Sequence, residues 1–182
     1  MMKKIAVIGC GGSGKSTLSR ELGQLLSIPV HHLDKIFWKP NWAPMLHTEF
    51  LEAQKAIYAT DSWILDGNYG GTMKPRLGEV DTIIFLDLST LSCLKGAISR
   101  YFEYRNRTRP DMSEGNNERL DKDFLLWILS YRRTRRPAII SMLQELEQTK
   151  EVVILSNRPA IRKFVGQIKN KQNEPLSSQA KH

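Results

Sequence analysis

A glycine-rich run near the amino terminus has the residue types that can hold a phosphate chain. Residues 9–16 read GCGGSGKS, which satisfies G-x-x-x-x-G-K-[ST] at every fixed position. Glycines let the backbone turn tightly and present N–H groups to phosphate oxygens, and a helix that starts after the loop points its positive end at the same oxygens. Lys15 can reach the β- and γ-phosphates, and the Ser16 hydroxyl can ligate Mg²⁺. The expected ligand is therefore a Mg-nucleoside triphosphate, with ATP as the cofactor.

Eight residues of this run are predicted to contact the nucleotide: Gly9, Gly11, Gly12, Ser13, Gly14, Lys15, Ser16 and Thr17. A chance glycine turn before a helix is the structural alternative. The expected strand before the loop and the expected helix after it favour phosphate binding, because the mechanism requires both. Cys10 occupies an unconstrained position and is expected to be a small filler, not a nucleophile.

Three aspartates follow predicted strands, at the sheet edge where ligands bind in open α/β folds: Asp34, Asp66 and Asp87. A carboxylate there can hold Mg²⁺ or orient an acceptor hydroxyl, whereas capping of a turn or helix is the alternative. Asp66 is the first candidate because Gly67 allows close approach, so Ser16 and Asp66 are expected to hold the metal ion. Asp34 is expected to orient or deprotonate an acceptor hydroxyl. Asp87 is expected to be structural.

Positive charge is concentrated between residues 95 and 136. This stretch has eleven Lys or Arg against six Asp or Glu, so it contributes +5 of the formal net charge of +8. Arginines positioned beside a phosphoryl group can neutralise its oxygens during transfer. Arg105, Arg107 and Arg109 alternate with neutral residues, as expected of an extended arm, although surface ion pairs are the alternative for each. A second cluster at 132–136 either approaches the triphosphate or solvates a helix junction, and the second role is expected for at least two of its four arginines.

Four aromatic residues lie near the predicted strand ends or in the insertion after the second strand: Trp38, Trp42, Trp63 and Tyr69. Planar rings there could stack on a base or form the wall of an acceptor pocket. Core packing is the usual alternative, and it is expected for Trp63 at a strand start. Phe124 and Trp127 occur at helical spacing and are expected to pack.

These runs together resemble the adenylate-kinase-like nucleoside and nucleotide kinases. The residues that carry this resemblance are the glycine-rich loop, Asp66-Gly67, the Ile-Ile-Phe-Leu-Asp run at 83–87 and the arginine-rich segment after it. A narrower resemblance is to the bacterial DNA topology modulation (FlaR-related) proteins. It rests on the runs HLDKIFW at 32–38, WILDGNY at 63–69 and RPD at 109–111, followed by ERLD at 118–121. The resemblance extends to about Lys169.

The resemblance implies a three-layer P-loop fold with a five-stranded parallel sheet of order 2-3-1-4-5 and an arginine-rich lid at about 105–120. It also implies ATP as phosphoryl donor, with adenine near Asn157 and Arg158, and Arg100 near the nucleotide. The sequence departs from true adenylate kinases, which have Asp-Gly-Phe-Pro-Arg where this chain has DGNYG at 66–70. The arginine that would grip a monophosphate is missing there, and Arg76 is the near substitute. AMP is therefore not the expected acceptor.

Apolar β-branched runs alternate with helical patterns along the chain, which predicts helices around a parallel sheet. The expected strands are Lys3–Gly9, Pro29–His32, Trp63–Asp66, Thr82–Leu88 and Val152–Ser156. The expected helices are Gly14–Ser27, Thr48–Ala59, Leu91–Asn106, Asn117–Arg133, Pro137–Thr149 and Ala160–Lys169. The stretch between 108 and 117 is rich in turn-forming residues and is expected to be an exposed loop.

The 182 residues suit one domain, expected to span 1–169, with a flexible tail at 170–182. The apolar runs are far shorter than the roughly 20 residues of a membrane span, so no membrane association is expected. Only two cysteines are present, so no disulfide framework is expected and a cytoplasmic location fits best.

The leading hypothesis is an ATP-dependent kinase that acts on a small hydroxyl compound, nucleoside or nucleotide, as a monomer or homodimer. Its predicted catalytic residues are Lys15, Asp34, Arg100, Arg105 and Arg109. Its predicted acceptor-binding residues are Asp34, Trp38, Asp66, Gly67, Asn68, Tyr69 and Arg76. The alternative is a nucleotide-dependent DNA-binding regulator, which the net charge permits. It is not favoured, because the sequence carries no recognisable nucleic-acid-binding motif.

Overall fold

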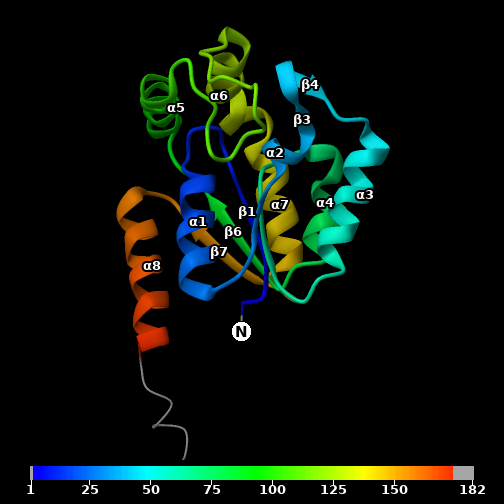
Figure 1. Cartoon of the computed structure of the whole chain (residues 1–182). Coiled ribbons are helices and arrows are strands. Elements are labelled where there is room, and N and C mark those ends of the chain that lie inside the picture. Colours follow the sequence, from blue (N-terminus) through cyan, green and yellow to red (C-terminus); the bar gives the residue numbers. More distant parts are fainter. Residues whose placement is uncertain (1, 174–182) are drawn as a thin grey trace, which may run out of the picture.

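The computed structural model describes residues 2–173, and its central feature is a parallel sheet of five strands (Figure 1). The strands are β1 (Lys4–Gly9), β2 (Val30–His32), β5 (Trp63–Asp66), β6 (Thr82–Leu86) and β7 (Glu151–Leu155). Their spatial order is β2-β5-β1-β6-β7, and every pairing is parallel. The labels differ from the expected 2-3-1-4-5 because a separate hairpin supplies β3 and β4. With that hairpin set aside, the five expected strands stand in the expected order.

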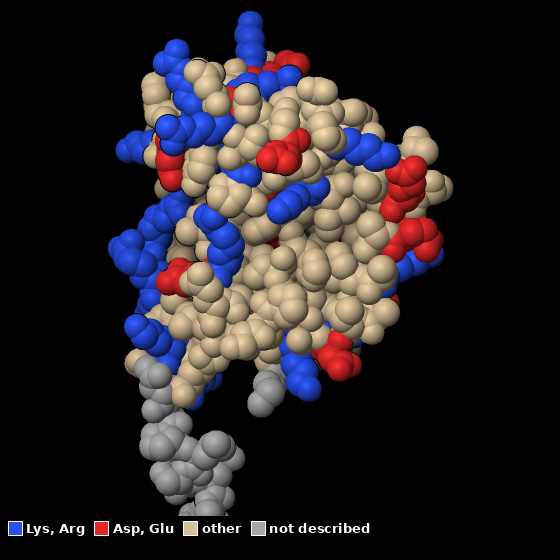
Figure 2. Space-filling view, viewed as in Figure 1, with Lys and Arg blue, Asp and Glu red and all other residues tan. Residues whose placement is uncertain are grey.

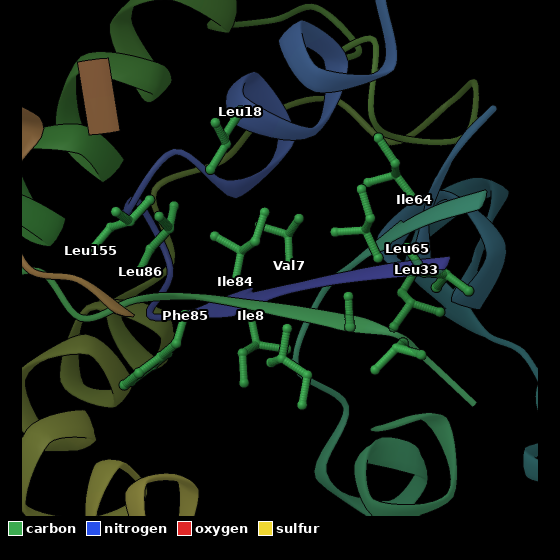
Figure 3. Close-up of a cluster of buried hydrophobic side chains, with 14 of the residues drawn as sticks. Val7, Ile8, Leu18, Leu33, Ile64, Leu65, Ile84, Phe85, Leu86 and Leu155 are labelled. Carbon is green, nitrogen blue, oxygen red and sulfur yellow. The ribbon is translucent and has the colours of Figure 1, made fainter. Parts of the chain in front are cut away.

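Helices cover both faces of the sheet and complete a three-layer α/β fold. They are α1 (Lys15–Leu26), α2 (Leu33–Phe37), α3 (His47–Tyr58), α4 (Gly70–Gly78), α5 (Thr90–Tyr104), α6 (Lys122–Thr134), α7 (Arg136–Leu146) and α8 (Arg158–Asn173). Helices α1 and α8 lie on one face, and α4 and α7 lie on the other (Figures 1 and 3). Within residues 2–173, no helix combines the length and apolar character that crossing a bilayer requires.

The core follows the two-residue alternation of the buried strands. Val7 and Ile84 are register partners that point toward Leu18 of α1, while the next pair, Ile8 and Phe85, points to the opposite layer (Figure 3). All five of these side chains are at most 2% exposed. Because helices cover both faces of the sheet, each of these strands is a continuous apolar run in the sequence instead of an alternating one. These runs allowed the strands to be predicted from the sequence.

Three short elements were not predicted. Helix α2, the hairpin of β3 (Trp38–Lys39) and β4 (Ala43–Pro44), and helix α4 are too short or too irregular for a periodic signal. The hairpin turns through the 3₁₀ segment η1 (Pro40–Trp42), in which Asn41 and Trp42 adopt left-handed backbone conformations. Helix α4 contains Pro75, a residue that usually argues against a helix interior.

Two predicted helix boundaries were wrong by four or more residues. The helix expected from Asn117 begins at Lys122, because the Asp121 side chain caps it by accepting a hydrogen bond from the backbone N–H of Asp123 at 2.8 Å. Helix α8 continues to Asn173, so the segment expected to be a tail from residue 170 begins as helix. The rest of that predicted tail, 174–182, lies outside the described residues.

Gly12 lets the phosphate-binding loop pack against α5, and its replacement by alanine tests this packing. A Cβ atom there would overlap backbone atoms of Cys93 and Ala97, at a positive φ of 74°. We expect Gly12→Ala to lower the free energy of unfolding by at least about 2 kcal/mol, from steric overlap and backbone strain. The measurement is urea denaturation followed by circular dichroism.

Gly166→Ala is the matched control, because Gly166 lies inside α8 with open space around its Cβ position. This change should raise the stability by up to about 1 kcal/mol through helix propensity. Equal effects of the two substitutions would contradict the packing described for Gly12.

Candidate functional site

A cavity of about 960 Å³ lies beyond the carboxyl ends of the central strands. The phosphate-binding loop, the residues after β5, helices α5 and α6 and the segment between these two helices all contribute to its wall. We call residues 105–120 the lid segment; they form isolated bridges but no helix or longer strand. The cavity therefore gathers segments that are far apart in the sequence around the loop predicted to bind phosphate.

The loop at 9–16 connects β1 to α1, as its motif predicts. Gly12 and Gly14 have positive φ angles of 74° and 95°, and the helix begins at Lys15, so its amino-terminal N–H groups face the cavity. Lys15 donates a hydrogen bond from Nζ to the backbone oxygen of Cys10 at 3.0 Å, which holds the ammonium group across the loop. These features fit a triphosphate, because backbone donors, a helix terminus and a lysine converge on one volume.

The predicted nucleotide contacts divide into two groups. Six loop residues line the cavity, namely Gly11, Gly12, Gly14, Lys15, Ser16 and Thr17. Gly9 and Ser13 shape the loop from behind instead: the N–H of Gly9 donates to the side-chain oxygen of Asn68 at 3.0 Å, and the N–H of Ser13 donates to the Cys10 oxygen at 3.2 Å.

Of the two residues expected near adenine, Arg158 lines the cavity and Asn157 does not. Arg158 lines the cavity and donates from Nη2 to the backbone oxygen of Gly12 at 3.4 Å. Asn157 does not line it; its side-chain oxygen caps α8 by accepting a hydrogen bond from the N–H of Ala160 at 2.8 Å. Asn157 is therefore a helix cap in this structure, a role that its position before α8 could have indicated.

Phe124 and Trp127 were expected only to pack, and they also line the cavity. Their rings stack with centroids 6.0 Å apart and planes 10° apart, and Phe124 lies against Gly11 of the phosphate-binding loop. The Arg100 guanidinium lies over the Phe124 ring, 5.3 Å from its centroid. Their helical spacing gave no sign of this second role, because one face of α6 serves both the core and the cavity.

Asp66 and Asp34 both reach the cavity from the ends of neighbouring elements. Asp66 is 3% exposed, and its Oδ2 lies 2.8 Å from Nδ1 of His32. Burial acts to lower the pKa of His32, but the hydrogen bond and charge of Asp66 outweigh it and raise this pKa above its ordinary value. Asp34 accepts a hydrogen bond from the Tyr69 hydroxyl at 2.7 Å. Burial, and then the Asp34 charge, raise the pKa of Tyr69, so this hydroxyl remains a donor.

Arg76 was predicted to bind the acceptor, but it does not line the cavity. It is fully buried, and it donates to the backbone oxygens of Gly67 at 2.9 Å and Asn68 at 2.6 Å. Burial lowers its pKa to about 10, so it stays charged at neutral pH. Arg76 therefore supports the loop after β5 from beneath instead of lining the cavity, because the loop oxygens there have no strand partner and the guanidinium supplies one.

Ion pairs hold the lid segment together, and one of them joins it to α5. Arg109 donates to Asp111 at 3.1 Å and pairs with Glu118 through an Nε–Oε2 distance of 2.7 Å, while Arg100 donates from Nε to the other Glu118 oxygen at 2.9 Å. Burial acts to raise the pKa of Asp111, but the Arg109 charge and a hydrogen bond from Ser16 outweigh it and hold this pKa below its usual range. Asp111 and Glu118 were missed as site residues. The signal that could have found them is a carboxylate inside an otherwise basic segment.

Apart from Arg119, the remaining arginines between residues 95 and 136 lie outside this cavity. Arg105 and Arg107 are exposed and do not line it, so the structure does not bring Arg105 to the predicted catalytic group. Asp87 binds two members of the second basic cluster: Arg136 through both carboxylate oxygens at 2.7 Å, and Arg132 at 3.2 Å. Asp87 thus joins β6 to the junction of α6 and α7, which is the structural role expected for it.

Asn116 joins the lid segment to the hairpin that carries Trp38 and Trp42. Its side chain is fully buried; it accepts a hydrogen bond from the N–H of Trp42 at 2.6 Å and donates to the backbone oxygens of Trp38 at 3.4 Å and Lys39 at 3.1 Å. The Arg119 guanidinium also lies over the Trp42 ring, 4.8 Å from its centroid. We call these contacts the lid–hairpin latch. They close one side of the cavity.

No family model and no curated protein matches this sequence. Solved structures do match its fold. A shikimate kinase of Acinetobacter baumannii, in complex with shikimate, has a TM-score of 0.57 at 16% sequence identity, covering 100% of this chain and 97% of that one. A shikimate kinase of Bacteroides thetaiotaomicron has a TM-score of 0.54 at 14% identity, covering 94% and 99% of the two chains. The chain therefore has the fold of the P-loop kinases, with a five-stranded parallel sheet.

The lid–hairpin latch can be tested by removing the Asn116 side chain. In Asn116→Ala the Trp42 N–H loses its acceptor, so its hydrogen exchange should accelerate by about tenfold, the equivalent of one buried hydrogen bond. Hydrogen–deuterium exchange of peptides that cover 38–46 measures this. Asn117→Ala is the control, because Asn117 is exposed and pairs only within the lid segment, with Thr108. Unchanged exchange in Asn116→Ala would rule out the latch.

Proposed function

We propose that the protein is an ATP-dependent phosphotransferase that moves the γ-phosphoryl group to a hydroxyl of a small molecule. One observation carries this proposal: the phosphate-binding loop and the Asp34–Tyr69 pair face the same cavity. The first group binds a triphosphate tail, and the second can receive a hydroxyl proton. The resemblance in fold to P-loop kinases supports the same reaction class.

The transfer needs few covalent contributions from the protein. The acceptor oxygen forms a bond to the γ-phosphorus, the bond from that phosphorus to the β–γ bridging oxygen breaks, and ADP departs with the electron pair. Asp34 accepts the proton of the attacking hydroxyl, and Tyr69 orients this carboxylate through its hydrogen bond. Lys15 and the loop N–H groups hold the phosphates.

Ser16 and Asp66 supply oxygen atoms of the kind that Mg²⁺ prefers, and both line the cavity. These two residues would hold a Mg²⁺ ion, which would supply positive charge to offset that of the transferred phosphoryl group. Arg100 and Arg109 also line the cavity, and each keeps N–H donors beyond those engaged with Glu118. We assign these two arginines the orientation of phosphoryl oxygens. Arg105 is left out of this assignment because it is exposed outside the cavity.

The DNA-binding alternative, which the resemblance to topology modulation proteins raised, has less support. Five of the eleven basic residues between 95 and 136 form ion pairs with carboxylates of the same chain. In Figure 2, most blue side chains lie along the left and top edges with a few red ones among them, and the middle of the visible face is largely uncharged. A salt-sensitive gel shift of duplex DNA at physiological ionic strength would favour this alternative.

The proposed function is tested with Mg-ATP and a panel of nucleosides, nucleotides and small alcohols. We expect ADP to form in the presence of one acceptor and not in its absence. Lys15→Ala should weaken ATP binding by at least about tenfold, because it removes a charge-assisted contact to the phosphates. Calorimetric titration with Mg-ATP measures this. A uniform slow release of ADP with every compound and with none would defeat the proposal.

Asp34→Asn separates binding from chemistry. The variant should bind Mg-ATP like the unmodified protein but lose about 10²- to 10⁴-fold in acceptor-dependent turnover, because an amide cannot receive the hydroxyl proton. Asp61→Asn is the matched control, since Asp61 is exposed and lies outside the cavity wall. Full turnover in Asp34→Asn would remove Asp34 from the proposed mechanism.

A further inference from the structure

The part of the cavity away from the phosphate-binding loop is bounded by Asp34, Trp38, Trp42, Tyr69 and Met112. We call these residues the acceptor end. They come from α2, the β3–β4 hairpin, the loop after β5 and the lid segment. The charges and aromatic rings of this wall determine which kind of acceptor can bind there.

The arginines around the acceptor end are already engaged with the protein itself. Arg76 is buried on backbone oxygens beneath the loop after β5. Arg100 and Arg109 face the carboxylates of Asp111 and Glu118, so that two cations meet two anions.

Two further arginines complete the cavity wall on the side of the lid segment and α1. Arg119 lies over the Trp42 ring and within 3.7 Å of Asp121. Arg20 of α1 has no ion pair among the described residues, and its charge acts on His32 and Tyr104. Because Asp34 and Asp66 add two more carboxylates, the described residues offer an anionic acceptor little unpaired positive charge.

The rings at the acceptor end are arranged to contact a flat molecule. Trp38 and Trp42 meet edge to face with centroids 5.7 Å apart, and Phe37 packs against both Trp38 and Tyr69 at 4.9 Å. Trp38, Trp42 and Tyr69 are only partly buried, so part of each ring remains available within the cavity. The Arg119 guanidinium already occupies one face of Trp42, the position that a cationic ligand would seek.

We propose that the acceptor end selects an uncharged compound with a planar ring and a hydroxyl group, such as a nucleoside, and discriminates against a phosphomonoester or a carboxylate. The ring stacks on Trp38 while the hydroxyl reaches Asp34, whose carboxylate Tyr69 orients. An anion there meets the paired cluster and the Asp34 charge, and none of the five residues of the acceptor end carries a positive charge to balance them. This inference rests on the proposed function and names the acceptor class for it.

The test compares each nucleoside with its own 5′-monophosphate, because the two differ only in the charged group. Binding is measured by calorimetry in the presence of saturating Mg-ADP, with adenosine, guanosine, cytidine and thymidine as probes, and with shikimate as a carboxylate probe. We expect at least one nucleoside to bind at least about tenfold more tightly than its monophosphate and than shikimate. A monophosphate that binds more tightly than its nucleoside would overturn the proposal, as would the absence of binding by every nucleoside.

Substitutions at Trp38 and Glu118 test the stacking part and the charge part of the proposal separately. Trp38→Leu should weaken nucleoside binding by about tenfold through lost stacking, and Trp38→Phe should restore most of it. Glu118→Gln removes one of the two carboxylates that neutralise Arg100 and Arg109, so it should strengthen binding of a monophosphate relative to binding of its nucleoside. Phe102→Leu is the aromatic control, because Phe102 is 68% exposed on α5 and lies outside the cavity wall. Unaltered nucleoside binding in Trp38→Leu would also overturn the proposal.

Failure of the acceptor class is distinguishable from failure of the proposed function. Mg-ADP binding, measured first in every titration, reports on the phosphate-binding loop alone. If Mg-ADP does not bind, the proposed function fails. If Mg-ADP binds but an anionic probe is preferred, only the acceptor class is wrong, and Arg20→Gln should then weaken binding of that anion, because Arg20 lines the cavity and has no ion pair among residues 2–173.

Discussion

The guanidinium group of Arg76 donates hydrogen bonds to the backbone oxygens of Gly67 and Asn68, beneath the loop that follows β5. Asn68, fixed in this way, accepts a hydrogen bond from the N–H of Gly9, where the phosphate-binding loop begins. The same loop carries Tyr69, which orients Asp34. One buried cation thus connects the phosphate-binding side of the cavity with the acceptor end, and a buried charge is tolerated there because carbonyl oxygens surround it.

On the side of the cavity formed by α5 and the lid segment, basic and acidic side chains neutralise one another. Arg109, Asp111 and Glu118 are buried, and the partly buried Arg100 completes a group of two cations and two anions. Breaking one pair would leave its partner without a compensating charge in a poorly solvated place. Most basic side chains between residues 95 and 136 are exposed, whereas Arg109 is buried against carboxylates of the same segment. The net charge of this region therefore overstates the positive charge that the cavity offers to a ligand.

The parts of the fold and site that the sequence predicted are those with strong local patterns. The phosphate-binding loop depends on contiguous residue types, and the five strands are buried on both faces, so both could be recognised. The roles of Asn116 and Arg76 could not be recognised, because each depends on partners brought together by the tertiary fold: the hydrogen-bond partners of Asn116 lie 74 to 78 residues away in the chain. Arg76 was predicted to bind the acceptor by analogy with the arginine of adenylate kinases. Its burial depends on how distant segments pack around it, which the sequence does not show.

The short β3–β4 hairpin turns through two consecutive left-handed residues, Asn41 and Trp42, and neither is glycine. Such a turn is costly for a tryptophan, and the latch from Asn116 is the contact that holds its backbone. The side-chain amide accepts one hydrogen bond from the hairpin and donates two, so a carboxylate could satisfy only the first and an apolar group of similar size none of them. The hairpin and the lid segment therefore move together as one arm. If the nucleotide draws the lid segment inward and the acceptor draws the hairpin inward, each ligand places the arm where the other one needs it. The nucleotide and the acceptor should then strengthen each other's binding by the same factor.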